Sequence, residues 1–226
     1  MTGLQADRLA DTMLNRLLRE TWTKVMTPIA TLFLRLGISP DVVTVVGTAG
    51  VCVGALAFYP RGQLLVGTLV ITLFIFSDNV DGVMARMSGR QGPWGAYLDS
   101  TLDRIGDAAI FGGLVLYFAG VHENLLAAGL ALACLILGFV VSYSKARAEG
   151  LGMTANVGIA ERADRLLAVL LAAFLVGVGV PVVLLVVVLA LLSLASLVTV
   201  VQRMIAVRRQ TLARTPDQHT PGLSAP

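Results

Sequence analysis

The chain has 226 residues, of which 56% are hydrophobic and only 14% are charged. Together with a mean hydropathy of +0.82, this composition is typical of an integral membrane protein and leaves no room for a large soluble domain. The net charge of +3 is too small to indicate a nucleic-acid partner.

The first predicted element is an amphipathic helix that precedes the membrane spans. Residues 1–40 carry scattered Arg and Lys side chains among Leu, Met and Trp22, and they lack the apolar core of a signal peptide. We therefore predict that this segment is an uncleaved juxtamembrane helix on the cytoplasmic surface of the membrane.

Six membrane spans are predicted next, because long apolar runs alternate with short breaks that contain Gly, Pro or charged residues. They cover residues 41–59, 64–86, 95–118, 124–146, 161–179 and 182–202. Of the 17 Lys and Arg residues, Arg61 alone lies in the first, third or fifth turn, so both termini are predicted to be cytoplasmic. The chain is thus divided into the segment 1–40, a six-span domain over 41–203 and a polar cytoplasmic tail over 204–226.

The second and third spans carry carboxylates, although a charged Asp at a helix centre costs about 2.5 to 3.5 kcal/mol in a membrane. Counted from the turn at 90–91, at about 1.5 Å per residue, Asp78 matches Asp103 in depth and Asp81 matches Asp99. Spacings of three and four residues put each pair on one helix face. Four oxygen ligands without His or Cys indicate Mg²⁺ or Mn²⁺, bound as a two-ion cluster that could clamp a phosphoryl group. The alternative is a cation or proton pathway in a transporter.

Small residues lie between these acids. Gly82 and Ala85 would let a flat base or a pyrophosphate approach the backbone, and Arg86, one turn nearer to water, could hold a phosphate. The alternative is that Gly82 and Ala85 serve only the close packing of two helices.

These residues resemble the signature of the CDP-alcohol phosphotransferases, DxxDGxxAR, eight residues, then GxxxDxxxD. Every fixed position is present, as Asp78, Asp81, Gly82, Ala85, Arg86, Gly95, Asp99 and Asp103. The resemblance implies a six-span all-α homodimer that transfers a substituted phosphate from a CDP-linked donor to an alcohol and releases CMP. It also implies that Asp78, Asp81 and Asp99 bind the metals, and that Asp103 is both a metal ligand and the general base.

A second segment, 39–44, is similar to the family's N/S-P-x-x-x-T element, which touches the cytidine. Its Asp41, Val42, Val43 and Thr44 therefore join Gly82, Ala85 and Arg86 as expected CDP-diacylglycerol-binding residues. Gly92 stands where many relatives have Ser or Thr, so a backbone contact to the donor is expected there. The alternative for the start of this segment is helix-entry chemistry, with Ser39 as the cap and Pro40 in the first turn.

The acceptor is inferred from cations at the cytoplasmic ends of the last three spans. These cations are Lys145, Arg147, Arg162, Arg165 and Arg203. Arg forks and Lys charges suit a sugar-alcohol phosphate, although positive-inside anchoring would also place cations there. The segments 142–149 and 161–165 resemble the actinobacterial phosphatidylinositol phosphate synthases, and this resemblance implies an inositol phosphate pocket made by Lys145, Arg165 and Arg203.

We therefore predict an all-α, multi-pass enzyme of the plasma membrane with its active site facing the cytoplasm. It would transfer the phosphatidyl group from CDP-diacylglycerol to myo-inositol phosphate, giving phosphatidylinositol phosphate and CMP, while the lipid tails stay in a groove beside the second and third spans. The bilayer and a second copy of the chain are its expected partners. Glycerol 3-phosphate is the alternative acceptor, and a transporter that leaves CDP-diacylglycerol intact is the alternative of another class.

Overall fold

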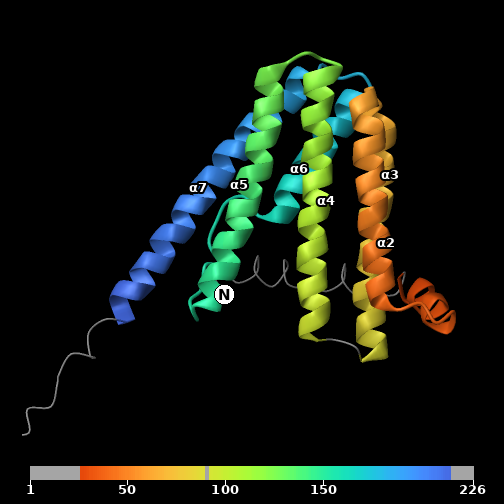
Figure 1. The fold of residues 1–226 in the computed structure, drawn as a ribbon, viewed down its shortest axis with the longest axis vertical. Coiled ribbons are helices and arrows are strands. Elements are labelled where there is room, and N and C mark those ends of the chain that lie inside the picture. Colours follow the sequence, from red (N-terminus) through yellow and green to blue (C-terminus); the bar gives the residue numbers. More distant parts are fainter. Residues whose placement is uncertain (1–25, 90–91, 215–226) are drawn as a thin grey trace, which may run out of the picture.

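A computed structural model describes residues 26–89 and 92–214, apart from the side chains of Asp78 and Asn79. Within these residues the fold is entirely helical, which confirms the predicted all-α class (Figure 1). The helices are α2 (Pro40–Val53), the π-helix η1 (Gly54–Phe58), the 3₁₀ turn η2 (Tyr59–Arg61), α3 (Leu64–Ser88), α4 (Pro93–Gly120), α5 (Leu125–Gly150), α6 (Arg162–Gly177) and α7 (Val183–Arg214). Residues 26–35 form a further helix before α2; the rest of the predicted amphipathic helix, 1–25, lies outside the described residues.

The helices begin and end at capping residues that are visible in the sequence. At the start of α2, the Ser39 hydroxyl accepts a 3.4 Å hydrogen bond from the backbone N–H three residues on. Helix α3 ends at Gly89, whose φ of 66° is left-handed and favours Gly, and α4 begins with Pro93 in its first turn. The Asn124 side chain caps α5 by accepting a 3.0 Å hydrogen bond from a backbone N–H.

Helix α7 continues beyond the end that the sequence analysis assigned to it. The last span was predicted to end at residue 202, with a polar tail from 204, whereas α7 runs without a break to Arg214. The stretch after Gln202 is rich in Arg, Gln, Leu and Ala, which favour a helix, and the first Pro is Pro216. Residues 215–226 lie outside the described part of the chain.

Four helical stretches of the described chain are long and apolar enough to cross a membrane. They are Pro40–Arg61, Leu64–Ser88, Leu125–Gly150 and Val183–Ala213. Helix α4 carries several charged residues in its first half, and α6 has only 16 residues. The chain is thus a multi-pass membrane protein, and the count of six spans stays a prediction.

The helices form a bundle in which α3 packs against α2 and α6, α4 packs against α2 and α5, and α7 packs against α5 and α6. Figure 1 shows that the end of α3, the start of α4, the end of α5 and the end of α7 lie in the lower half of the bundle, whereas the α4–α5 and α6–α7 connections lie at its upper end. The motif halves on α3 and α4 and the cations at the end of α5 therefore belong to the same end of the molecule.

Close packing of α4 against η1 gives a prediction for the stability of the fold. A Cβ atom on Gly113 of α4 would lie 2.8 Å from the Ala55 carbonyl oxygen of η1, whereas a Cβ on Gly112 would meet nothing within 4 Å. We expect Gly113→Ala to lower the free energy of unfolding by about 1 to 3 kcal/mol, because the two backbones must separate. Denaturation in detergent measures this, with Gly112→Ala as the matched control. Equal stability of the two variants would contradict the packing described here.

Candidate active site

The ends of α2, α3 and α4 enclose a pocket of about 320 Å³, called the motif pocket below. Its lining includes the carboxylates Asp81 and Asp99 together with Asp41, Thr44, Gly82, Ala85, Arg86 and Gly92. The structure thus brings together, in one pocket, six of the eight residues that the sequence analysis assigned to the CDP-linked donor. They come from three helices that are separate in sequence.

Two hydrogen bonds fix the start of α2 against the motif helices. The Thr44 hydroxyl is buried and donates to Asp81 Oδ2 on α3, and it lies 3.1 Å from the Pro40 carbonyl oxygen. Trp94 Nε1 on α4 donates to Asp41 Oδ2 at 3.0 Å. The two polar residues of α2 that line the motif pocket are therefore each tied to one of its other two walls.

Val42 and Val43 lie on other faces of α2. Val43 is buried in a small apolar cluster with Val80 and Met84, and Val42 is 51% exposed. Successive helical residues are about 100° apart, so only positions three or four apart, such as Asp41 and Thr44, share the pocket face. The two valines do not line the motif pocket.

The four motif carboxylates occupy different surroundings. Asp81 on α3 and Asp99 on α4 both line the motif pocket, whereas Asp103 is paired with an arginine of α6. The side chain of Asp78 is not among the described ones, and the described side chains contain no group of three His, Cys, Asp or Glu that could hold a metal. Two carboxylates without nitrogen or sulfur ligands fit a hard divalent cation, so the chemistry of the donor set agrees with Mg²⁺ or Mn²⁺.

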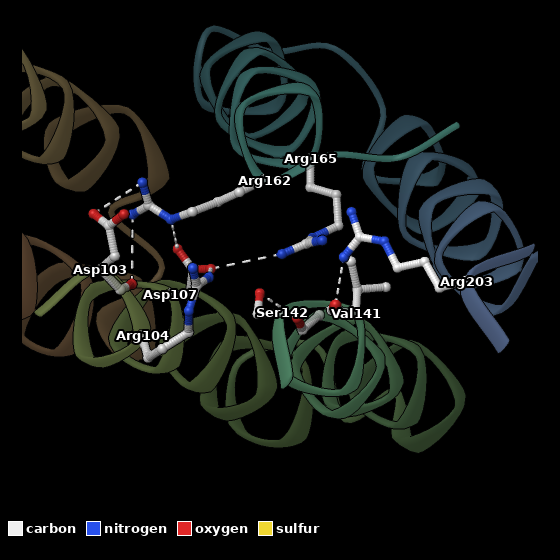
Figure 2. Close-up of polar contacts among 9 residues, drawn as sticks. Asp103, Arg104, Asp107, Val141, Ser142, Arg162, Arg165 and Arg203 are labelled. Atoms are coloured by element: carbon white, nitrogen blue, oxygen red, sulfur yellow. Dashed lines mark hydrogen bonds and ion pairs between the residues drawn. The ribbon is translucent and has the colours of Figure 1, made fainter. Parts of the chain in front are cut away.

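A network of charged groups connects α4 with α6 (Figure 2). Arg162 bridges two acids of α4, with Nη1 3.0 Å from Asp103 Oδ1 and Nε 3.0 Å from Asp107 Oδ1. The other oxygen of Asp107 lies 3.3 Å from Arg104 Nη1 and 3.7 Å from Arg165 Nη2. The network joins Asp103, the predicted general base, to Arg162 and Arg165, which are predicted to bind the acceptor.

The sequence analysis missed Asp107 and Arg104. A signal was present, because Asp99, Asp103 and Asp107 follow one another at intervals of four residues and so lie along one face of α4. Asp107 falls outside the resemblance motif, however, and its burial could not be derived without the packing of α4.

Arg165 is buried, with only 1% of its surface exposed. Its Nε and Nη1 atoms have no hydrogen-bond partner among the described residues. A Cβ atom on Gly138 of α5 would lie 3.0 Å from Arg165 Nη2, so Gly138 leaves the space that this guanidinium fills. Unpartnered donors of a buried charge are costly, and an anion beside them would remove that cost.

A second pocket of about 230 Å³, called the basic pocket below, lies between the ends of α4, α5, α6 and α7. Its cations are Arg104, Lys145, Arg162 and Arg203, and Glu149 and Glu161 also line it. Three of the five cations predicted to bind the acceptor thus meet in one pocket. The other two do not line the basic pocket: Arg165 faces Asp107 in the charged network, and Arg147 is exposed.

Helix α7 holds the wall of the basic pocket in position. Arg203 donates from Nη1 to the Val141 carbonyl oxygen and from Nε to the Val157 carbonyl oxygen, the latter at 3.0 Å. The Thr199 hydroxyl oxygen accepts from the backbone N–H groups of Ile159 and Ala160 at 3.1 and 3.2 Å. The linker between α5 and α6 is therefore fixed to α7, and Arg203 is structural as well as being available to a ligand.

The capping box of α6 fixes the residue at which this helix begins, and thereby the positions of its first arginines. The side chain of Glu161 accepts from the backbone of the first turn, and Asp164 accepts a 3.2 Å hydrogen bond from the Glu161 N–H. Arg162 and Arg165 follow on adjacent positions of one face, three residues apart.

An apolar groove of about 470 Å³ lies on the other side of α2 from the motif pocket. It is lined by Met26, Ile29 and Phe33 of the first described helix, by Val42 and Val46 of α2, and by Leu73, Phe76 and Val80 of α3. Val80 and Asp81 are neighbours on α3, so the groove and the motif pocket adjoin. This groove lies beside the first and second predicted spans, whereas the sequence analysis expected one beside the second and third.

The fold and the site define a multi-pass membrane protein with a carboxylate-lined pocket next to an apolar groove. The chain belongs to the CDP-alcohol phosphatidyltransferase family, whose sequence model matches residues 37–158. It is 52% identical over 205 residues to the phosphatidylinositol phosphate synthase of Streptomyces avermitilis, covering 88% of this chain and 84% of that one. It is also 52% identical to the phosphatidylinositol phosphate synthase of Cutibacterium acnes over 198 residues, covering 84% of this chain and 96% of that one.

The fold is similar to crystal structures of the phosphatidylinositol phosphate synthase of Mycobacterium tuberculosis. The structure with CDP-DAG bound has a TM-score of 0.79 and 40% sequence identity, covering 81% of this chain and 94% of that one. The structure in complex with manganese and citrate has a TM-score of 0.76 at the same identity, covering 81% of this chain and 88% of that one.

Proposed function

We propose that this chain transfers the phosphatidyl group of CDP-diacylglycerol to myo-inositol phosphate, giving phosphatidylinositol phosphate and CMP. The observation that carries this proposal is the position of Arg162, which pairs with the motif residue Asp103 and also lines the basic pocket. An acceptor whose phosphate lies in the basic pocket would have its hydroxyl near Asp103. The two relatives at 52% identity are named phosphatidylinositol phosphate synthases, and this name states the product that we propose.

The donor is proposed to lie across α2. Its cytidine and pyrophosphate would fill the motif pocket, with Asp41 and Thr44 on one side and Gly82, Ala85 and Arg86 on the other, while Gly92 offers backbone contacts. Its acyl chains would run into the adjoining apolar groove. The combination of a polar pocket and an apolar groove on two sides of one helix suits an amphiphile with a nucleotide head.

Asp81 and Asp99, together with Asp78 and Asp103, are the residues proposed to hold two Mg²⁺ or Mn²⁺ ions. Such ions neutralise the charge that accumulates on the pyrophosphate when its bond breaks. The hydrogen bond from Thr44 to Asp81 would orient that carboxylate. The manganese complex of the mycobacterial relative supports a divalent cation in this family.

The proposed reaction is an in-line displacement. Asp103 takes the proton of the acceptor hydroxyl, and the freed oxygen forms a bond to the phosphorus on the diacylglycerol side. The bond from that phosphorus to the bridging pyrophosphate oxygen breaks, and CMP leaves with the electron pair. Arg162, beside Asp103, would stabilise the carboxylate in its charged form until the acceptor arrives.

All six main helices are proposed to cross the membrane, with both termini in the cytoplasm. Helix α4 joins the lower end of α3 to the upper end of α5, whereas the linker after α5 rises from its lower end to the start of α6, which continues to the upper end of α7 (Figure 1). This course along α3, α5 and α7, which are long and apolar enough to cross a membrane, supports a crossing by both helices. The cations at the lower end favour the cytoplasm for the active site, the plasma membrane is the proposed location, and residues 1–40 would lie on its surface. A homodimer is proposed from the family resemblance.

Gly82 provides a test of the donor site. A Cβ atom at this position would meet only Arg86 Nη1, at 3.8 Å, so there is space for Ala but the larger Leu would fill the motif pocket. We expect Gly82→Leu to raise the apparent KM for CDP-diacylglycerol at least 10-fold, while Gly82→Ala keeps near-parental affinity. If Gly82→Leu lowers only the melting temperature and leaves the donor KM unchanged, the glycine serves helix packing instead.

The proposed function is tested with purified protein, labelled CDP-diacylglycerol and a panel of acceptors. Release of CMP that depends on myo-inositol phosphate is the expected result. Faster turnover with glycerol 3-phosphate would assign the basic pocket to that acceptor, and faster turnover with unphosphorylated inositol would overturn the phosphate-binding role. A transporter would leave CDP-diacylglycerol intact with every acceptor.

A further inference from the structure

Asp107 is the most enclosed acid of the charged network. It is only 3% exposed, and both of its carboxylate oxygens are used. Oδ1 receives Arg162 Nε at 3.0 Å, and Oδ2 faces Arg104 at 3.3 Å and Arg165 at 3.7 Å. A single buried carboxylate therefore contacts arginines from two helices, α4 and α6.

The network contains more positive than negative charge. Three arginines face two carboxylates, Asp103 and Asp107, and of these five groups Arg165 and Asp107 are buried. The buried Arg165 also keeps two nitrogens without a partner among the described residues. Such an excess of buried donors and charge is suited to a bound anion, and a phosphate group supplies both the charge and the acceptor oxygens.

Arg162 is oriented by the two acids that it bridges. A guanidinium has five N–H groups, and Arg162 directs one to Asp107, one to the Asp103 carboxylate and one, at 3.4 Å, to the Asp103 carbonyl oxygen. Two N–H groups remain for a ligand in the basic pocket, which Arg162 lines. Without Asp107, the Nε end of the fork would lose its partner, and the direction of the remaining N–H groups would no longer be fixed.

We propose that Asp107 is a positioning residue for the acceptor phosphate. It holds Arg162 in the orientation that the phosphate requires, and it does not itself touch substrate or metal. This inference rests on the proposed function, because it assigns a phosphorylated acceptor to the basic pocket. It adds a residue to the acceptor site that lies outside the motif of four acids and outside the cations predicted from the sequence.

The test is a double-mutant cycle on acceptor binding. Outer partners that orient a metal ligand are worth about 10- to 100-fold in affinity, and we expect the same order here for Asp107→Asn. If Asp107 acts through Arg162, then Asp107→Asn combined with Arg162→Gln should bind myo-inositol phosphate no more than about 2-fold more weakly than Arg162→Gln alone. The control cycle pairs Asp107→Asn with Lys145→Gln, because Lys145 lines the basic pocket and is not one of the cations paired with Asp107, and there the two losses should multiply.

Two readouts separate positioning from a general structural role. The dissociation constant of myo-inositol phosphate is measured by calorimetry on purified protein without metal, and the apparent KM of each substrate is measured during turnover. Asp107→Asn should raise the acceptor constants and leave the KM for CDP-diacylglycerol within about 2-fold. Multiplying losses in the Arg162 cycle, or equal losses for donor and acceptor, would overturn the inference.

A second variant keeps the test decisive if Asp107→Asn does not fold. Arg162→Lys retains the charge but cannot reach both acids with a planar fork, so it should lose nearly as much acceptor affinity as Arg162→Gln. Parental affinity in Arg162→Lys would contradict the inference. Failure of the proposed function is recognised separately, because the parental protein would then show no preference for a phosphorylated acceptor.

Discussion

Replacing Asp103 by Asn is expected to reduce kcat by about 10²- to 10⁴-fold, the usual contribution of a general base. The amide has nearly the same shape but cannot take the proton of the acceptor hydroxyl. Arg162 would keep its contact with Asp107, at 3.0 Å, so the helices should stay in position. Single-turnover rates of CMP release, measured at saturating donor and acceptor, test the chemical step directly.

A carboxylate that binds only metal should respond differently from Asp103, which is also the proposed base. Asp99→Asn is also expected to abolish turnover under standard conditions, because it removes one of the carboxylates of the motif pocket, and Asp78→Asn should behave alike. Raising the Mn²⁺ concentration should partly restore Asp99→Asn but not Asp103→Asn. Glu123→Gln, an exposed acid in the α4–α5 connection, is the charge-matched control and should keep full activity. Full activity in Asp99→Asn would contradict the metal assignment.

The second large effect is expected for the basic pocket. Lys145→Gln removes a charge-assisted contact to the acceptor phosphate, typically worth about 1.5 to 3 kcal/mol, so the apparent acceptor KM should rise by roughly 10- to 150-fold. The donor KM should stay unchanged, because Lys145 does not line the motif pocket. Steady-state kinetics with each substrate varied in turn measure both values.

The other cations allow this prediction to be controlled. Arg147→Gln changes an exposed cation two residues from Lys145 that lies outside the basic pocket, and it should leave the acceptor KM near the parental value. Arg203→Gln should weaken acceptor binding. It should also lower the melting temperature, because Arg203 donates hydrogen bonds to the carbonyl oxygens of Val141 and Val157. Equal effects of Lys145→Gln and Arg147→Gln would mean that these cations only anchor the protein at the membrane surface.

Apolar runs and breakers were sufficient to predict the all-α class and the order of the main helices. Gly89 and Pro93 mark the α3–α4 turn in the sequence as they do in the structure, so the depths of Asp81 and Asp99 could be obtained by counting. Helix α7 continues to Arg214, past the predicted end of the span at residue 202, although the polar composition of this stretch favoured a tail. An amphiphilic helix can leave the membrane and continue in water until a Pro intervenes.

The network behind the motif could not be predicted in the same way. Arg147 and Arg165 are both cations near the ends of predicted spans. The residues around them in the sequence do not show that Arg147 is exposed and that Arg165 is buried beside Gly138. That difference depends on how α5 packs with α6. The only sign of Asp107 in the sequence was its four-residue spacing from Asp103. Its contacts with three arginines depend on side-chain orientations that only the tertiary structure shows.

The position of Val80 in the apolar groove and of Asp81 in the motif pocket has a consequence for how the protein meets its lipid substrate. Neighbouring residues of one helix fix the level at which head and tails divide, so the lipid is used at its own depth and is not lifted out of the bilayer. Encounter is then a two-dimensional search within the leaflet. The velocity should follow the mole fraction of donor in the membrane or micelle, and adding inert lipid at a constant bulk donor concentration should slow the enzyme by surface dilution.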